Sequence, residues 1–593
     1  MLVYGGSGMN PVIFDIETDA LDNYTRIHSI VVRDAVTGDV LASTHQEIGH
    51  GESLRMLANA GVIVGHNVIN FDLPALEKLL GFRTQAQVVD TLVLSRLAYP
   101  DIRTDDYKRE SFPKAMIGSH SLKAWGYRLG IHKDEFGEDA DWSRWTEQMQ
   151  EYCEQDTEVT RQLWHHLIQQ AISDRAWELE HNVALICRDI ERAGWSFDIS
   201  GAERLTAQLL TKRLELKEKL VKVFPPKKEV LKTKTKTIPF NPGSRLDIAR
   251  GLNELYGWKP VLVTPSGQPR IDEEILSELR YPEAEMLTEY LLVVKRLGQV
   301  AEGEEAWIKL AKGGKIHGRI NPGGTVTGRA SHARPNMAQV PASRSPYGKE
   351  CRSLFLPRNK WSLVGADASG LELRCLSHYL NAYDDGAYGK AVVSGDIHWQ
   401  NAIAFGLVAS GTKRDKHDPE HEAARNQSKT LIYAMIYGAG DQKLGSVLGC
   451  DAKVGKRLRA SFEKKVPAYK MLRDAVANAS KRGYLVGLDG RRLPIRSQHS
   501  ALNTLLQSAG AVVMKVALVD FVRGMVMDGL EWNKDFAVIG WIHDEFQIEC
   551  RPELAERVGH GAVASITAAG PELGFRCPLD GEFRAGASWA ETH

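Results

Sequence analysis

The sequence has few cysteines and no excess charge of either sign. Its seven cysteines form no CxxC pair, and their odd number argues against a disulfide framework, so we expect reduced thiols in an intracellular protein. We recognise no signal peptide and no apolar run long enough to span a bilayer, and we therefore expect no membrane segment. The first eight residues, which include a Gly/Ser stretch, are excluded from the fold interpretation.

Basic and acidic residues balance at 75 each, but they are unevenly distributed. Segment 212–236 has ten basic residues against three acidic ones, and segment 133–158 has ten acidic residues against two basic ones. Taken singly, such runs are more often solvated faces. Local potential decides phosphate binding, so zero net charge does not exclude a nucleic-acid partner.

The chain is too long for one hydrophobic core, and its pattern predicts a multidomain α/β protein. The α/β signals of the N-terminal part are strands at 12–18 and 61–67, a helix opening near Pro74, and a helix over 146–171. A largely helical part follows, interrupted by the Pro- and Lys-rich connector 224–245. Its alternating Lys and Thr fit either an exposed strand or a disordered loop.

Two acidic turns stand out in the C-terminal half. Asp367 ends the apolar strand 361–367, and Asp544 and Glu545 form the tip of a predicted hairpin between 536–542 and 546–550. Each alone is better explained as a turn residue or a helix cap. Side by side, they would present carboxylates to a pair of Mg²⁺ ions, which prefer oxygen ligands.

A predicted helix over 421–437 lies between these turns. Arg425, Lys429, Tyr433 and Tyr437 recur every four residues, which drifts only about 40° per step around a helix and keeps them on one face. The cations can hold a triphosphate, and the rings can pack on sugar and base. An ordinary amphipathic helix is the alternative.

The N-terminal part carries a second group of acids. Asp15 and Glu17 point to one face of a strand, and Tyr152 and Asp156 share one face of a helix. Asp72 precedes Pro74, so a helix N-cap is its alternative interpretation. Four carboxylates and a tyrosine are typical of two-metal phosphodiester hydrolysis.

These motifs resemble those of a known family. DASGLELR (Asp367–Arg374), RNQSKTLIYAMIYG (Arg425–Gly438) and IHDE (Ile542–Glu545) resemble motifs A, B and C of the family A, DNA polymerase I-like, DNA polymerases. The stretches Val326–Phe355 and Leu502–Lys515 extend the match, which is most similar to the replicative enzymes of T-odd podophages. DIE, NFD and YxxxD resemble the 3′–5′ proofreading exonucleases. The resemblance covers nearly the whole chain.

The resemblance implies a ribonuclease H-like exonuclease domain followed by a right-hand polymerase. The expected division is exonuclease 9–178, thumb 179–320, first part of the palm 321–380, fingers 381–502, and second part of the palm with the catalytic hairpin 503–593. The implied function is template-directed DNA synthesis with proofreading by an active exonuclease.

The resemblance also implies roles for single residues. Two Mg²⁺ ions would be held in the polymerase site and two in the exonuclease site, with Mn²⁺ as a substitute. The implied polymerase metal ligands are Asp367, Ala368 and Asp544. The implied nucleotide-binding residues are Arg425, Lys429 (also a proton donor), His398, Tyr433, Tyr437, Ala368 and Glu372, which would exclude a 2′-hydroxyl. The implied DNA contacts are Arg329, Gln507 and His543.

In the exonuclease, the resemblance implies direct metal binding by Asp15, Glu17 and Asp156. Asp72 would act partly through water, and Tyr152 would orient the attacking water.

The resemblance implies primer–template DNA and dNTPs as partners, together with a phage primase-helicase and a single-stranded DNA-binding protein, in the cytoplasm of a bacterial host. We expect no 5′-nuclease domain. The short connector 224–240 argues against thioredoxin recruitment through a large thumb insertion. Its lysines, Lys232, Lys234 and Lys236, are instead candidates for contacts to the DNA backbone.

Three rival functions predict other features of the sequence. A nuclease with a polymerase-like scaffold predicts a damaged motif A, B or C, and a non-catalytic DNA-binding protein predicts loss of carboxylates at both sites. Neither kind of damage is present in the sequence. An RNA polymerase of related architecture is disfavoured by Glu372, because a ribose-accepting pocket should not carry that bulky acid.

Overall fold

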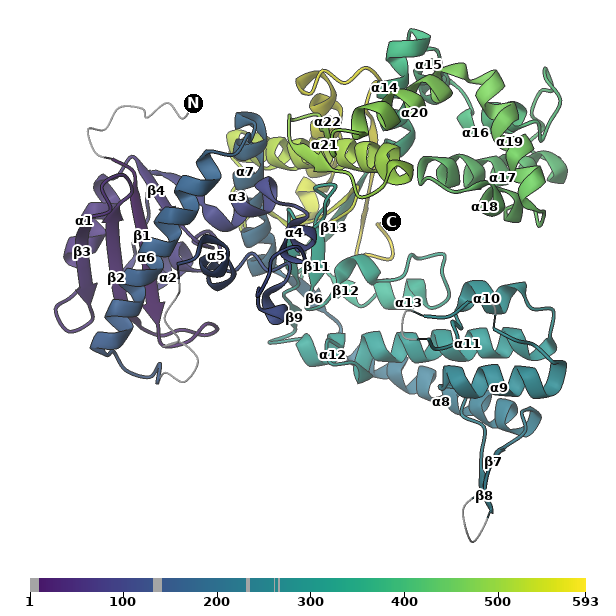
Figure 1. Ribbon diagram of the computed structural model, residues 1–593, viewed down its shortest axis with the longest axis horizontal. Helices are drawn as coiled ribbons and strands as arrows, with labels where there is room; N and C mark the ends of the chain where they lie inside the picture. Colours follow the sequence, from purple (N-terminus) through teal and green to yellow (C-terminus); the bar gives the residue numbers. More distant parts are fainter. Residues whose placement is uncertain (1–9, 132–140, 231–234, 261, 265–266, 593) are drawn as a thin grey trace.

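The computed structural model describes residues 10–131, 141–230, 235–260, 262–264 and 267–592. Figure 1 shows an N-terminal α/β region at the left, joined to a larger region whose two helical arms extend to the right. The lower arm is formed by residues from the middle of the sequence, and the upper arm by later ones.

The N-terminal region is built on a five-stranded sheet of order β3-β2-β1-β4-β5. β1 pairs antiparallel with β2 and parallel with β4. The strands are β1 (Val12–Thr18), β2 (Ile27–Asp34), β3 (Val40–His45), β4 (Val62–Gly65) and β5 (Gln87–Asp90). The helices are α1 (Gly51–Asn59), α2 (Asp72–Leu80), α3 (Thr91–Ala98), α4 (Ile102–Asp106), α5 (Leu122–Leu129) and α6 (Glu147–Ile168).

One face of the central strand β1 is buried through Val12, Phe14 and Ile16, whereas the other face carries Ile13 followed by Asp15 and Glu17. Helix α6 packs across β1 and β2, which brings the acids of β1 against the buried face of the helix. Thr146 caps α6 by accepting a hydrogen bond from the backbone N–H of Met149. The expected strands and helices of this region are therefore confirmed within a few residues.

Helix α7 (Asp174–Ala193) joins the two regions. It packs on α3 of the first region and on α21 (Ala501–Met527) and β16 (Phe536–Ile542) of the second. Glu180 on α7 accepts hydrogen bonds from Lys515 and, at 2.6 Å, from Arg491, which also pairs with Asp489 at 2.6 Å. All four side chains are at most 4% exposed. The junction is thus a buried, mutually compensated charge cluster.

The helices of the lower arm lie within residues 179–320, the range in which we expect the thumb. Its long helices α8 (Ile199–Val223) and α11 (Pro282–Leu297) pack along each other, with α9 (Arg245–Tyr256) and α10 (Glu273–Glu278) beside them. The Lys-rich connector forms the antiparallel strands β7 (Lys227–Val230) and β8 (Thr235–Ile238), which project from the end of the arm. Lys236 is exposed on β8, whereas Lys232 and Lys234 lie outside the described residues.

The centre of the larger region is a four-stranded sheet of order β16-β17-β13-β18. β13 (Ser362–Ala368) pairs antiparallel with both β17 (Glu545–Cys550) and β18 (Gly581–Gly586). Helices α21 and α22 (Ala555–Glu572) pack against each other, and α22 lies on the sheet. The strands of this sheet come from both ranges expected for the palm, 321–380 and 503–593, and its core merges with that of the upper helical arm.

The expectation that no segment could span a bilayer is corrected by α21. Residues 498–527 form a helix that is long and apolar enough to do so by length and composition. The reason is its position: 83% of its most apolar stretch is buried inside the protein. A helix that is apolar all round is typical of a protein core as well as of a membrane.

Most of the upper arm lies within residues 381–502, the range in which we expect the fingers, but its first helix begins at Leu371, inside the range expected for the first part of the palm. The arm consists of α14 (Leu371–Asp384), α15 (Ala387–Ser394), α16 (Ile397–Phe405), α17 (Pro419–Ile436), α18 (Asp441–Ser446), α19 (Ala452–Lys465) and α20 (Pro467–Ser480). Short elements connect the arms to the palm: β6 (Trp195–Phe197), α12 (Trp307–Leu310), β9 (Lys315–Ile316), β10 (Arg319–Asn321), β11 (Ser331–Ala333), α13 (Gly348–Arg352), β12 (Phe355–Leu356), β14 (Tyr484–Val486) and β15 (Arg492–Pro494).

Candidate active sites

The palm sheet brings the two acidic turns together. Asp367 of β13 lies opposite Glu545 of β17 in the strand register. The backbone N–H of Ala368 donates a 3.1 Å hydrogen bond to the carbonyl of Asp544. Asp367 and Asp544 therefore lie on neighbouring segments at the same end of one sheet, although they are 177 positions apart along the chain.

Glu545 is not part of the hairpin tip. It is the first residue of β17, is 3% exposed, and accepts a 2.7 Å hydrogen bond from the indole N–H of Trp589. Gln547 also donates to its carboxylate. The turn is made by His543 and Asp544 alone, and His543 adopts the left-handed conformation with φ of 58°. Glu545 therefore anchors the hairpin to the C-terminal segment.

A cleft of about 820 Å³ opens beside this turn. Its lining includes Arg329, Glu372, Tyr437, His543 and Asp544. The hydroxyl of Tyr437 donates to Glu372 at 2.5 Å, and Arg329 lies 3.7 Å from the same carboxylate. Burial raises the pKa of Asp544, and the nearby carboxylate of Glu372 raises it further. A cation bound nearby would offset both effects and favour the charged form of this carboxylate.

The cations of α17 lie on the fingers side. Arg425 is held by Asp396 at 2.9 Å, and Arg414 pairs with the same carboxylate at 2.5 Å. Lys429 and Arg425 both lie close enough to His398 to lower its pKa, but burial is the larger cause, and the value falls to about 4. The ring of Tyr433 lies 6.3 Å from that of His398.

His398 is therefore neutral near pH 7, and it would donate a hydrogen bond to a phosphate rather than a positive charge. Its Nδ1 is buried and has no hydrogen-bond partner among the described residues. A buried polar atom of this kind fits a ligand that completes its hydrogen bonding.

The three predicted DNA contacts are placed along the palm. Arg329 and His543 line the cleft, and Gln507 is half-buried on α21, beside the lining residue Leu506. The backbone carbonyl of Arg329 accepts a 3.0 Å hydrogen bond from Thr325, which fixes the turn before it.

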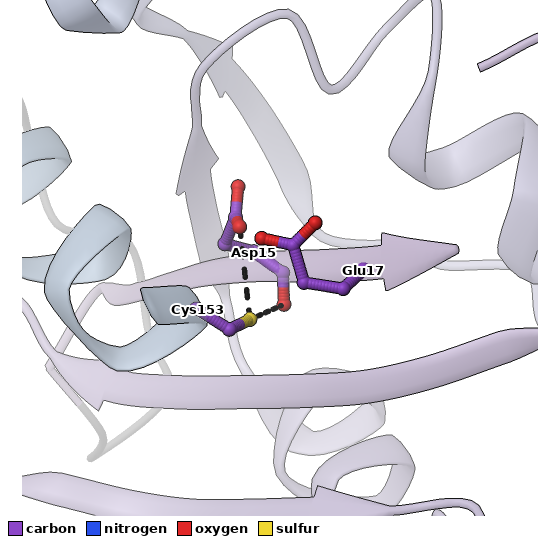
Figure 2. Close-up of side chains that lie close together, drawn as sticks. All are labelled: Asp15, Glu17 and Cys153. Carbon is purple, nitrogen blue, oxygen red and sulfur yellow. Dashed lines mark hydrogen bonds between the residues drawn. The ribbon is translucent and has the colours of Figure 1, made fainter. Parts of the chain in front are cut away.

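The exonuclease candidates converge on β1 and α6. Asp15, Glu17 and Cys153 form a group whose possible ligand atoms all lie within 4.8 Å of one another. Figure 2 shows the three side chains turned toward a common point between β1 and α6. The thiol of Cys153 donates to the backbone carbonyl of Asp15 at 3.5 Å and to its carboxylate at 3.6 Å. Burial and the surrounding carboxylates raise the pKa of this thiol.

Asp72 and Asp156 complete the acidic group and are 3% and 4% exposed. Asp72 does not cap α2, which is the alternative considered above; its carboxylate accepts a 3.2 Å hydrogen bond from the backbone N–H of Ile16. Burial and the neighbouring Asp15 raise the pKa of Asp72 well above its ordinary value. Tyr152 stands one residue before Cys153 and contacts Trp142 edge-on at 6.3 Å.

Sequence reasoning missed Asp396 and Cys153. Asp396 lies 29 residues before Arg425, and no spacing rule connects the two. Cys153 had a signal, since it directly follows Tyr152 and precedes Asp156 by three residues, which brings it onto a neighbouring part of the helix surface.

Comparison with known proteins decides the identity of the chain. Residues 206–591 match the family described as DNA polymerase family A, and residues 2–172 match the family described as 3′-5′ exonuclease. The chain belongs to the family A DNA polymerases. It is a DNA-directed DNA polymerase with a 3′–5′ proofreading exonuclease domain, and both families depend on divalent metal ions.

Its relatives include two phage polymerases. The DNA-directed DNA polymerase of Escherichia phage T7 is 33% identical over 98% of this chain and 100% of its own length, and that of Enterobacteria phage T3 is 32% identical over the same shares. Each alignment runs over 719 positions, more than the 593 residues of this polymerase. Both relatives therefore contain segments without a counterpart here.

A solved structure supports the fold. The polymerase domain of Pol1 from M. smegmatis, in a complex with DNA primer-template and dNTP, superposes with a TM-score of 0.77 at 19% identity, over 99% of this chain and 97% of that one.

The residues of both sites fit divalent cations. The polymerase site offers two carboxylates on neighbouring segments of one sheet, and burial disfavours the charged form of Asp544 in the absence of a counter-ion. The exonuclease site packs carboxylates close enough to disfavour one another's ionisation. Such crowded acids are the arrangement that a cation stabilises.

Proposed function

We propose that Asp367 and Asp544 are the metal-binding carboxylates of the polymerase site, and that Asp15, Glu17, Asp72 and Asp156 are those of the exonuclease site. The supporting observation is that both groups converge in space from distant or independent motifs. For the palm, the decisive contact is the hydrogen bond between Ala368 and Asp544, which holds motifs A and C side by side. We further propose that each site takes two Mg²⁺ ions, or Mn²⁺ in their place.

In the polymerase site, the bound ions would lower the pKa of the primer 3′-hydroxyl and neutralise the nucleotide phosphates. Arg425 and Lys429 would bind the triphosphate, and Lys429 would donate a proton to the departing pyrophosphate. Asp396 keeps the guanidinium of Arg425 on the face shared with Lys429. The backbone carbonyl of Ala368 would be an additional oxygen ligand beside Asp367.

Sugar and base selection would involve two residues that line the cleft, Glu372 and Tyr437, together with Tyr433. Glu372 would close the pocket against a ribose 2′-hydroxyl, and the hydrogen bond from Tyr437 holds its carboxylate in place. Tyr433 would pack beside the sugar. Glu372→Ala is expected to raise incorporation of ribonucleotides about tenfold relative to deoxyribonucleotides, because one steric and polar barrier is removed. An unchanged ratio in single-nucleotide insertion would contradict this role.

Arg329, Gln507 and His543 would contact the primer terminus and the minor-groove acceptors, which are similar in all correct base pairs. Their support is position: two line the cleft beside Asp544, and the third lies on the helix that forms its floor.

In the exonuclease site, Asp15, Glu17 and Asp156 would bind the ions directly, and Asp72 would act partly through water. Tyr152 would orient the attacking water toward the phosphodiester bond. The supporting observations are the burial of Asp72 and Asp156, the hydrogen bond from Ile16 of β1 to Asp72, and the proximity of all four acids to Cys153, whose pKa they raise.

The test is a double dissociation on one primed single-stranded template with Mg²⁺. Asp544→Asn should reduce primer extension by at least about a thousandfold and leave primer digestion intact. Asp15→Ala combined with Glu17→Ala should do the reverse. Normal extension by Asp544→Asn would show that the metal assignment in the palm is wrong.

We also propose phage replication as the biological setting, in the cytoplasm of a bacterial host, with a primase-helicase and a single-stranded DNA-binding protein as partners. The similarity to two phage polymerases supports this. The short β7–β8 hairpin favours direct contact of its lysines with the DNA backbone over thioredoxin recruitment. Replacing Lys227, Lys228 and Lys236 by Gln should shorten the product length per binding event more than it slows single insertions. Equal product lengths would contradict the contact.

A further inference from the structure

Cys153 lies inside the acidic group of the exonuclease site. Its sulfur, a carboxylate oxygen of Asp15 and one of Glu17 are all within 4.8 Å of one another (Figure 2). Ligand atoms this close together could hold one metal ion, and one of them is a cysteine sulfur. The side chain is fully buried, and its thiol points at Asp15 from the adjacent helix.

The separations match those of a shared ion. Three atoms no more than 4.8 Å apart can all lie within about 2.8 Å of one point, so shifts of a few tenths of an ångström bring them to metal–ligand bond lengths of about 2.0–2.6 Å. A tetrahedral ion with a Zn–S bond of about 2.3 Å and a Zn–O bond of about 2.0 Å holds the two ligand atoms about 3.5 Å apart. The sulfur of Cys153 lies 3.6 Å from the carboxylate of Asp15.

The chemistry of the donors sorts metal ions into two classes. Mg²⁺ takes oxygen ligands, so in its presence the thiol remains a hydrogen-bond donor to Asp15. Zn²⁺ and Cd²⁺ bind sulfur strongly, and a coordinating thiol passes its proton to solvent as the metal–sulfur bond forms. The same three side chains can therefore serve both classes with different ligand atoms.

We infer that Cys153 makes the exonuclease centre a site for thiophilic divalent ions, bound by its sulfur together with Asp15 and Glu17. This inference rests on the proposed metal-binding role of Asp15 and Glu17. A thiophilic ion competes with Mg²⁺ at the editing site. The palm carboxylates, which have oxygen donors, do not gain this preference. Trace Zn²⁺ would thus suppress proofreading while extension continues.

The test uses the full-length protein with Cys450→Ser as the parent, because Cys450 is the exposed cysteine of the seven. Cd²⁺ is titrated into this parent and followed by sulfur-to-cadmium charge-transfer absorption and by calorimetry. A charge-transfer band should appear at one equivalent. Cys153→Ser and Cys153→Ala should both lose the band and weaken Cd²⁺ binding about tenfold or more. Binding of Mg²⁺ should change by less than about threefold, because sulfur is not its ligand.

Cys187→Ser is the matched control, since Cys187 is buried on α7 outside the group, and it should keep the band. Primer extension by each variant verifies that the chain is folded. A band of equal intensity in Cys153→Ser, or no band in a parent that digests primers with Mg²⁺, would overturn the inference alone. A parent that neither digests primers with Mg²⁺ nor binds Cd²⁺ would overturn the assignment of Asp15 and Glu17 as well.

Discussion

The two active sites are built in different ways. The exonuclease acids come from one sheet and the two helices packed on it, and they are mostly buried before any substrate arrives. The polymerase acids lie at one end of the two central strands of a sheet, while the cations for the nucleotide are carried by α17 in a separate arm. The first site is therefore largely preformed, whereas the second depends on the placement of the fingers relative to the palm.

The largest expected effect concerns the junction that fixes these two sites in one molecule. Glu180→Gln should lower the free energy of unfolding by about 3–5 kcal/mol, because it leaves Lys515 and Arg491 buried with one compensating carboxylate fewer. Chemical denaturation measures this. Glu178→Gln, an exposed position on the same helix, should change stability by less than about 0.5 kcal/mol. Equal effects of the two substitutions would contradict the role of the cluster.

Arg425→Ala should separate the two sites functionally. Loss of the cation that Asp396 positions is expected to lower kcat/KM for dNTP insertion by about 10- to 100-fold, with primer digestion unchanged. Single-nucleotide kinetics and a digestion assay measure both. Arg457→Ala, an exposed change elsewhere in the fingers, should leave both rates as they are. A comparable loss of digestion would mean that the fingers influence editing as well.

Metal loading without DNA should distinguish a preformed site from an open one. Affinity rises with the number of carboxylates, so Mn²⁺ should fill the exonuclease site at concentrations about tenfold lower than the polymerase site. Titration followed by electron paramagnetic resonance measures the two classes. Asp15→Ala with Glu17→Ala should remove the tight class, and Asp544→Asn the weak one. Loss of the weak class in the Asp15/Glu17 variant, or of the tight class in Asp544→Asn, would contradict the difference between the two sites.

The smallest effect is a pH dependence of stability at the packing of α21 on α22. Burial, and then Glu572, raise the pKa of Asp520 to about 6. The folded protein keeps this proton up to about pH 6, while the unfolded chain loses it near pH 4, so this group stabilises less as pH rises through that window.

Asp520→Asn should therefore stabilise the protein above pH 6, by a few tenths of a kcal/mol because solvent screens this partly exposed pair. Thermal unfolding at pH 5 and pH 8 measures the difference. A gain at pH 5 that equals or exceeds the gain at pH 8 would contradict the assignment.

Sequence alone predicted the parts of both sites that depend on local periodicity. The strand β13, the hairpin β16–β17 and the face shared by Arg425 and Lys429 follow from spacing within one element. Family resemblance then indicated that Asp367 and Asp544 meet, and the sheet register confirms their adjacency.

Contacts between elements could not be predicted in this way. The pairing of Asp396 with Arg425 and the burial of Glu545 under Trp589 depend on which element packs against which. The same holds for α21, whose composition fits a bilayer and whose partners in the core become known only with the fold. The sequence pattern describes one helix or strand at a time, whereas the burial and pairing of these residues depend on the element that packs against it.

Helix α7 also determines whether the two activities can be divided. His181 accepts a 3.0 Å hydrogen bond from the backbone N–H of Asp90 in the first region. Glu180, one residue earlier, belongs to the buried charge cluster of the junction. Residue 178, the expected domain boundary, lies within this helix. Cutting the chain there would divide α7, separate His181 from Asp90, and leave Glu180 as the second residue of the other piece, on a shortened helix. Separate editing and copying fragments would therefore each need a copy of α7.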